Sequence, residues 1–250
     1  MRKFGLIGYP LGHSFSQKYF TAKFAEEHIP DCSYENFPLT SLDSFHDLIS
    51  GNPDLCGLNV TIPYKTEILR YVAETDQIVS EISAANVLKI RRETGKTRII
   101  AYNSDVVGIR DSVISFFPET HGTALIIGTG GSSKAVSWTL RNLGFRVLIV
   151  SRNKKEDILG YEDINAQMLK NISLIVNTTP LGMFPNTEGK PDLDYNLLDE
   201  RHTLFDLVYN PEFTNFLKMG KARGCKIITG LKMLYSQADR SWEIWNDKNL

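Results

Sequence analysis

The sequence has few of the features that mark secreted or membrane-bound proteins. Its only 3 cysteines, Cys32, Cys56 and Cys225, lie too far apart to suggest a disulfide framework or a metal-ligand spacing. We expect them to be small buried side chains in a reducing compartment. No apolar run is long enough to span a bilayer, and the N-terminal residues lack the profile of a signal peptide. The sequence therefore predicts a cytoplasmic protein.

The chain also lacks an excess of charge of either sign. Its 28 lysines and arginines are balanced by 29 aspartates and glutamates, so we expect no basic surface for nucleic acid or for an anionic membrane. The 5 histidines show no spacing typical of metal ligands, and we predict no metal site. What remains is a 250-residue chain of ordinary globular composition, long enough for one large or two modest domains.

The first hundred residues show strand and helix patterns in alternation. Short apolar runs predict strands at 3–8, 33–39 and 55–62, with helices from about 16 to 28 and at 42–49. Segments 85–91 and 98–101 predict a hairpin around Thr94 and Gly95. This part is expected to form a β-α-β-α-β unit with antiparallel strands added at an edge.

The pattern after residue 103 is typical of a doubly wound parallel sheet. Strands are predicted at 123–128, 146–151, 172–177, 203–208 and 225–229, and helices at 106–117, 132–143, 212–222 and 233–245. We therefore expect the α/β class with two α/β domains and a cleft between them. The pattern of the last helix does not show which sheet it packs against.

The most informative segment is a glycine-rich turn in the middle of the chain. An apolar run ends at Gly128, Gly130 and Gly131 follow, and a helical pattern begins at Ser132. Glycines permit a tight turn, and free N–H groups at a helix start can hold a pyrophosphate. A plain strand-to-helix turn is the alternative for this cluster taken alone.

The end of the next strand favours one cofactor over another. Arg152, Lys154 and Lys155 stand where NAD-selective sites usually have an acidic residue for the ribose 2′-hydroxyl. Lysine and arginine pair with a 2′-phosphate, arginine through its forked geometry. NADP is therefore preferred over NAD, and a solvated basic turn is the alternative.

Polar groups after the third strand are candidates for the chemistry. Asn59 and Thr61 alternate with apolar residues and share one face, and Lys65 follows a proline that stops the strand. Asp105, at the junction of the two expected domains, either caps a helix or meets Lys65 across the cleft. A lysine with a lowered pKa can remove the hydroxyl proton of a secondary alcohol during hydride transfer.

Three further polar residues leave two interpretations open. Asn86 lies in an apolar setting, so its amide either bonds to local backbone or faces a ligand. Ser14 and Ser16 precede a helical pattern, where two hydroxyls are either caps or an anion cradle.

Taken together, these blocks resemble the shikimate dehydrogenase family along nearly the whole chain. The most specific block is Asn-Val-Thr-x-Pro-x-Lys at 59–65, together with Asn-x-Asp at 103–105 and Gly-x-Gly-Gly at 128–131. The resemblance implies reversible NADPH-dependent reduction of 3-dehydroshikimate to shikimate, in the synthesis of chorismate and aromatic amino acids. Shikimate or 3-dehydroshikimate is the implied partner of a monomer or homodimer.

The resemblance implies that residues 1–103 plus 231–250 form an N-terminal substrate domain and that residues 104–230 form a Rossmann-type NADP-binding domain with a parallel sheet. It also implies roles for individual residues. Lys65 and Asp105 would be the catalytic pair. The implied substrate-binding residues are Ser14, Ser16, Asn59, Thr61, Asn86, Tyr209 and Gln237. The implied NADP-binding residues are Gly128, Thr129, Gly130, Gly131, Ser132, Ser151, Arg152, Lys154, Thr178, Thr179, Leu207 and Gly230. Two alternatives stay open: a quinate/shikimate dehydrogenase of broader substrate and cofactor use, and a non-catalytic cofactor-binding regulator.

Overall fold

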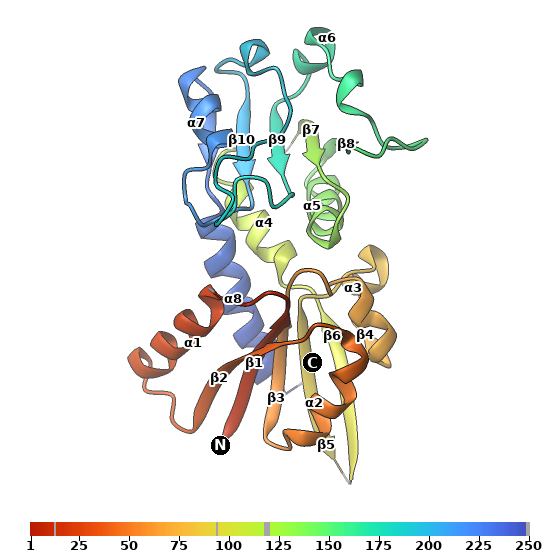
Figure 1. Ribbon diagram of the computed structural model, residues 1–250, viewed down its shortest axis with the longest axis vertical. Coiled ribbons are helices and arrows are strands. Elements are labelled where there is room, and N and C mark those ends of the chain that lie inside the picture. The colour runs from red at the N-terminus through yellow and green to blue at the C-terminus, as the bar shows by residue number, and fades with distance from the viewer. Residues whose placement is uncertain (13, 94, 118–120, 249–250) are drawn as a thin grey trace. The chain divides into compact units, whose positions relative to one another are not determined.

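The computed structural model describes residues 1–12, 14–93, 95–117 and 121–248 (Figure 1), so Thr94 of the predicted hairpin turn lies outside the described residues. The chain divides into two compact units, Met1–Ser104 with Ala238–Leu250 and Asp105–Gln237. Each unit has its own sheet, which is the α/β class that the sequence predicts. Which unit binds substrate and which binds the dinucleotide stays a prediction.

The first unit is built on a mixed sheet, sheet A, with the strand order β2-β1-β3-β5-β6-β4. β1 is parallel to β2 and β3, whereas β5 is antiparallel to β3 and β6, so the predicted parallel unit with an antiparallel edge is confirmed. The strands are β1 (Arg2–Gly8), β2 (Cys32–Pro38), β3 (Leu55–Val60), β4 (Glu74–Thr75), β5 (Val87–Glu93) and β6 (Lys96–Tyr102). The helices are α1 (Phe15–Glu26), α2 (Phe45–Gly51) and α3 (Gln77–Ile82), with 3-10 turns η1 (Leu42–Ser44) and η2 (Glu67–Tyr71).

Sheet A buries both of its faces, as the alternation along β1 requires. Phe4 belongs to a cluster with Phe20 of α1, whereas Ile7 belongs to a second cluster with Phe45 of α2. The last helix, α8 (Gly230–Asn246), contributes Trp245 to the first of these clusters, where its ring stacks on Phe4 at 4.8 Å between centroids. The helical pattern leaves its packing partner open, and the structure shows that the part of α8 within the first unit packs on sheet A.

The second unit contains sheet B, a parallel sheet with the order β11-β10-β9-β7-β8. Its strands are β7 (Gly122–Ile127), β8 (Phe145–Val150), β9 (Leu174–Asn177), β10 (Thr203–Asp206) and β11 (Lys226–Ile228). Its helices are α4 (Asp105–Val113), α5 (Gly131–Asn142), α6 (Ala166–Leu169) and α7 (Asn215–Ala222), with 3-10 turns η3 (Tyr161–Asp163) and η4 (Tyr195–Leu197). Because the strands are parallel, the segments that follow β7, β8, β9 and β10 meet at one edge, which we call the carboxyl edge.

Several expected element boundaries and caps are wrong. α4 begins at Asp105 itself, so Asp105 is its first residue rather than a cap on a helix starting at Val106. Ser14 occupies the N-cap position of α1 without a side-chain cap hydrogen bond, and Ser16 lies inside the first turn. α7 begins at Asn215 rather than at 212, because Thr214 caps it by accepting a hydrogen bond from the Leu217 N–H. The sequence analysis missed β4, α3 and α6 altogether.

None of the helices in the described part of the chain combines the length and the apolarity that crossing a membrane requires.

Candidate active site

Thr61, Lys65 and Asn86 lie on loops at one edge of sheet A, whereas Asn59 lies on β3 and Ser16 on α1. The N–H of Thr61 donates to the carbonyl of Ile7 at 2.9 Å, which joins the chain after β3 to the end of β1. The carbonyl of Lys65 accepts from the N–H of Ala85 at 2.7 Å, which joins the same loop to the start of β5. The fold thus fixes the backbone of Thr61 and Lys65 beside the segment that carries Asn86.

A buried network of polar side chains supports this edge. The Tyr34 hydroxyl donates to Asn59 Oδ1 at 2.8 Å, and Asn59 Nδ2 donates to Ser241 Oγ at 2.9 Å. The Oγ atoms of Ser241 and Ser104 are 3.1 Å apart, and Asn86 Nδ2 donates to Ser104 Oγ at 3.0 Å. Each amide is therefore compensated by protein partners, and the predicted substrate contacts of Asn59 and Asn86 stay predictions.

The sequence analysis assigned no role to Tyr34, Ser104 or Ser241. Tyr34 alternates with less buried residues along β2, and burial raises the pKa of its hydroxyl despite a hydrogen bond with Ser16. A tyrosine on the inward face of a strand was the available signal, because a buried phenol needs a hydrogen-bond partner.

Ser14 differs from the other polar residues of the first unit that were expected at the site. Its Oγ is buried and has no hydrogen-bond partner among the described residues. Buried hydroxyls are nearly always paired in folded proteins, so this oxygen is suited to a ligand's polar atom. This observation favours the anion-cradle interpretation of Ser14 over the cap.

The glycine turn of the second unit has the geometry of a phosphate cradle. Gly128 has φ +112°, and a Cβ there would lie 2.7 Å from Thr178 Oγ1, so only glycine fits. A Cβ on Gly130, the N-cap of α5, would meet no atom within 4 Å. The first N–H groups of α5 have no partner inside the helix, and Gly130 supplies no side-chain cap. The helix start is therefore open to an anion.

A buried carboxylate organises the neighbouring part of the carboxyl edge. Asp206, the last residue of β10, accepts from Asn177 Nδ2 at 3.0 Å, from the Val208 N–H at 3.0 Å and from Thr214 Oγ1 at 2.5 Å. Asn177 Oδ1 in turn accepts from the N–H and the hydroxyl of Thr179 at 3.1 and 2.6 Å. Burial raises the pKa of Asp206 to about 6. The carboxylate thus connects the loops that carry Thr178, Thr179 and Leu207.

No role for Asn177, Asp206 or Thr214 followed from the sequence analysis. The available signal was a polar residue at the end of each of two neighbouring apolar strands, Leu-Ile-Val-Asn and Thr-Leu-Phe-Asp.

Leu207 and Tyr209 lie on the segment after β10, Gly230 and Gln237 lie on α8, and Asp105 begins α4. A Cβ on Gly230 would lie 2.7 Å from the carbonyl oxygen of Leu207, so the start of α8 packs directly on that backbone. Burial raises the pKa of Tyr209. Gln237 Nε2 donates to the carbonyl of Leu234 on its own helix at 2.9 Å. Asp105 belongs to this unit and Lys65 to the first, so their predicted pairing stays a prediction.

Part of the basic segment after β8 forms hydrogen bonds with other residues of the protein. Arg152 is exposed, and Ser151 donates its N–H to the carbonyl of Leu159 at 2.9 Å. Lys154 Nζ lies 2.7 Å from Asp163 Oδ1, and this hydrogen bond raises the pKa of Lys154.

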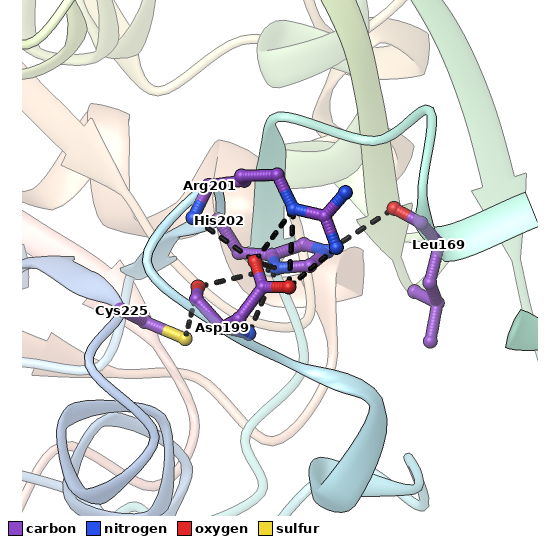
Figure 2. Close-up of polar contacts among 5 residues, drawn as sticks. All are labelled: Leu169, Asp199, Arg201, His202 and Cys225. Carbon is purple, nitrogen blue, oxygen red and sulfur yellow. Dashed lines mark hydrogen bonds and ion pairs between the residues drawn. The ribbon is translucent and has the colours of Figure 1, made fainter.

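A second polar cluster lies at the opposite, amino end of β10 (Figure 2). His202 is 1% exposed, its Nε2 lies 3.1 Å from the carbonyl oxygen of Leu169, and its Nδ1 accepts from the Asp199 N–H at 3.1 Å. Arg201 pairs with the Asp199 carboxylate and holds its pKa well below its usual range. The Cys225 thiol donates to the Asp199 carbonyl at 3.3 Å. These contacts close a turn, and they lie away from the carboxyl edge.

A strand, a glycine turn and an open helix start at the carboxyl edge of a parallel sheet define the class of dinucleotide-binding α/β proteins. The family model "Shikimate dehydrogenase substrate binding domain" matches residues 6–88. The "Shikimate dehydrogenase (NADP(+))" of Methanococcus maripaludis is 36% identical over 98% of this chain and 91% of its own length. The chain therefore belongs to the shikimate dehydrogenase family.

Solved structures agree with this fold. A shikimate dehydrogenase crystallised in complex with NADP+ has a TM-score of 0.84 and 32% identity, covering 98% of this chain and 90% of its own. The enzyme of Thermus thermophilus, in complex with NADP(H) and shikimate, has a TM-score of 0.85 and 27% identity, covering 98% of this chain and 94% of its own.

Proposed function

We propose that this protein is a shikimate dehydrogenase, an NADP-dependent oxidoreductase that acts on a CH–OH group. It reversibly reduces 3-dehydroshikimate to shikimate, a step in the synthesis of chorismate and aromatic amino acids. The observation that carries this conclusion is the alignment of 98% of the chain with an NADP-dependent relative at 36% identity. The cytoplasm and a monomer or homodimer remain the predicted location and assembly.

The N–H groups at the start of α5 and the basic side chains after β8 are suited to the phosphates of NADP, so we assign residues 104–230 to NADP binding. The open start of α5 would hold the pyrophosphate, since no atom lies within 4 Å of a Cβ placed on Gly130. Arg152 would pair with the 2′-phosphate, and Thr178, Thr179, Leu207 and Gly230 would border the bound cofactor. The bound cofactor supplies or accepts the hydride.

Residues of the first unit are assigned to the substrate. The buried Ser14 hydroxyl, which has no partner among the described residues, would donate to the substrate carboxylate together with Ser16. Asn59, Thr61, Asn86 and Gln237 would bond the ring hydroxyls. Tyr209 would line the substrate's binding site. Lys65 would donate a proton to the oxygen at C3 during reduction and remove it during oxidation, and Asp105 would orient the substrate.

The test of Lys65 separates chemistry from binding. If the lysine acts mainly in the transition state, Lys65→Ala should lower kcat by about a hundredfold or more and change the Kd for shikimate far less. Lys170→Ala, an exposed lysine after α6, is the matched control and should leave both values unchanged. A Lys65→Ala enzyme with near-normal turnover would contradict the assignment.

A further inference from the structure

The segment that follows β8 folds back on the strand it leaves. The N–H of Leu159 donates to the carbonyl of Ile149 at 2.8 Å, and the N–H of Ser151 donates to the carbonyl of Leu159 at 2.9 Å. Lys155 and Ile158 exchange two backbone hydrogen bonds of 3.1 Å, which close the tip of this fold. The chain therefore returns to the carboxyl end of β8 and brings η3 beside the basic segment.

This return places acidic side chains against the basic ones. Residues 151–163 contain Arg152, Lys154 and Lys155 but also Glu156, Asp157, Glu162 and Asp163. Two of the carboxylates reach one ammonium group, because Lys154 Nζ lies 2.7 Å from Asp163 Oδ1 and 4.0 Å from Glu162 Oε1. The basic cluster seen in the sequence is thus partly neutralised within its own loop.

Asp163 is fixed in this position by the backbone. Its Oδ2 accepts from the Gly160 N–H at 2.8 Å while Oδ1 accepts from Lys154. These two bonds lower the pKa of Asp163, the lysine contributing most. A phosphate that uses Lys154 must therefore share the ammonium with an anchored carboxylate or displace it.

We infer that Asp163 sets cofactor selectivity, by occupying Lys154 and leaving recognition of the 2′-phosphate to Arg152. The inference rests on the proposed use of NADP. Arg152 is exposed at the end of β8, and its guanidinium can meet a phosphate through two parallel hydrogen bonds. Removal of the Asp163 charge should release Lys154 as a second phosphate-binding cation and strengthen the preference for a phosphorylated ribose.

Two nucleotide fragments that differ only in the 2′-phosphate test the inference. Titration calorimetry would measure the Kd of adenosine 2′,5′-bisphosphate and of 5′-AMP. Asp163→Asn keeps an oxygen that can accept from the Gly160 N–H, and it should tighten binding of the bisphosphate about fivefold while leaving 5′-AMP unchanged. Glu156→Gln removes a charge from the same loop without altering the Lys154 contact, and is the matched control.

A double-mutant cycle checks that the effect passes through the lysine. Lys154→Gln should change bisphosphate affinity less than about twofold in the natural chain, but should abolish the gain in Asp163→Asn. Arg152→Gln should weaken the bisphosphate about tenfold in both backgrounds.

Unchanged or weaker bisphosphate binding by Asp163→Asn would overturn the inference. The inference would also be overturned if Lys154→Gln weakened bisphosphate binding as much as Arg152→Gln does. This comparison of two variants can be made even if Asp163→Asn does not fold. Shikimate oxidation with NADP by the natural chain is measured in parallel. If that activity is present, a negative result with the variants counts against this inference and not against the proposed function.

Discussion

The two ends of β10 carry polar clusters that look alike in composition but differ in what they connect. At the carboxyl end, Asp206 is fully buried and accepts hydrogen bonds from the end of β9, from the N-cap of α7 and from the backbone that directly follows it. At the amino end, His202 and Asp199 close one turn, and they contact the Leu169 carbonyl of α6 and the Cys225 thiol before β11. From this comparison we propose that the carboxyl-end cluster positions the loops that would bind the cofactor, whereas the amino-end cluster serves the fold alone.

The largest expected effect comes from removing the carboxylate at the carboxyl end. Asp206→Ala leaves Asn177 Nδ2, the Val208 N–H and Thr214 Oγ1 without their buried acceptor, so the free energy of unfolding should fall by about 3–5 kcal/mol. The KM for NADP should rise as well, because Thr179 loses its anchored neighbour Asn177. Urea unfolding and steady-state kinetics measure the two effects. A stable variant with an unchanged KM would break the comparison.

An equivalent change at the amino end should affect stability alone. His202→Ala removes a buried ring and its hydrogen bonds to Leu169 and Asp199, so we expect a loss of about 3 kcal/mol in unfolding free energy. The KM for NADP should stay within about twofold of the natural value, because ligands of parallel sheets bind at the opposite edge. If the KM rose as much as in Asp206→Ala, the two ends would not differ in the way we describe.

The pH dependence of stability should have opposite signs at the two ends. The folded-state pKa of Asp206 is raised to about 6, so the folded state binds more protons than the unfolded state between about pH 4 and 6. Measured against Asp206→Asn, the natural chain should therefore lose roughly 2 kcal/mol as the pH rises from 4 to 7. Asp199 has a lowered pKa, so its contribution is present above about pH 4 and is lost on further acidification.

Chemical unfolding of the natural chain, Asp206→Asn and Asp199→Asn from about pH 2 to about pH 7 tests both signs. Because Asp199 is more exposed, its effect should be the smaller of the two. Parallel stability curves for the natural chain and Asp206→Asn would show that the buried carboxylate does not titrate as we expect.

The sequence predicts most of the fold because the relevant signals are local. Apolar periodicity and glycines place the strand expected at 123–128 within one residue of β7, and they locate the turn before α5. The polar networks escape such analysis because their partners lie far apart along the chain. Asn59 and Ser241 are separated by 182 residues, and no local pattern brings them together.

The candidate site shows the same limit at shorter range. The basic residues after β8 are evident in the sequence, but the contact of Lys154 with Asp163 depends on a backbone fold between them. The sequence therefore indicates which residue types are present at the carboxyl edge. Only the structure shows which of these side chains already pair with other groups of the protein, as Lys154 does with Asp163.

The most direct test of the proposed function is the initial rate of formation of NADPH from NADP, or of NADH from NAD, followed by absorbance with shikimate or quinate as the substrate. We predict the highest kcat/KM for shikimate with NADP. A folded chain that binds NADP but forms no NADPH from shikimate would contradict the account.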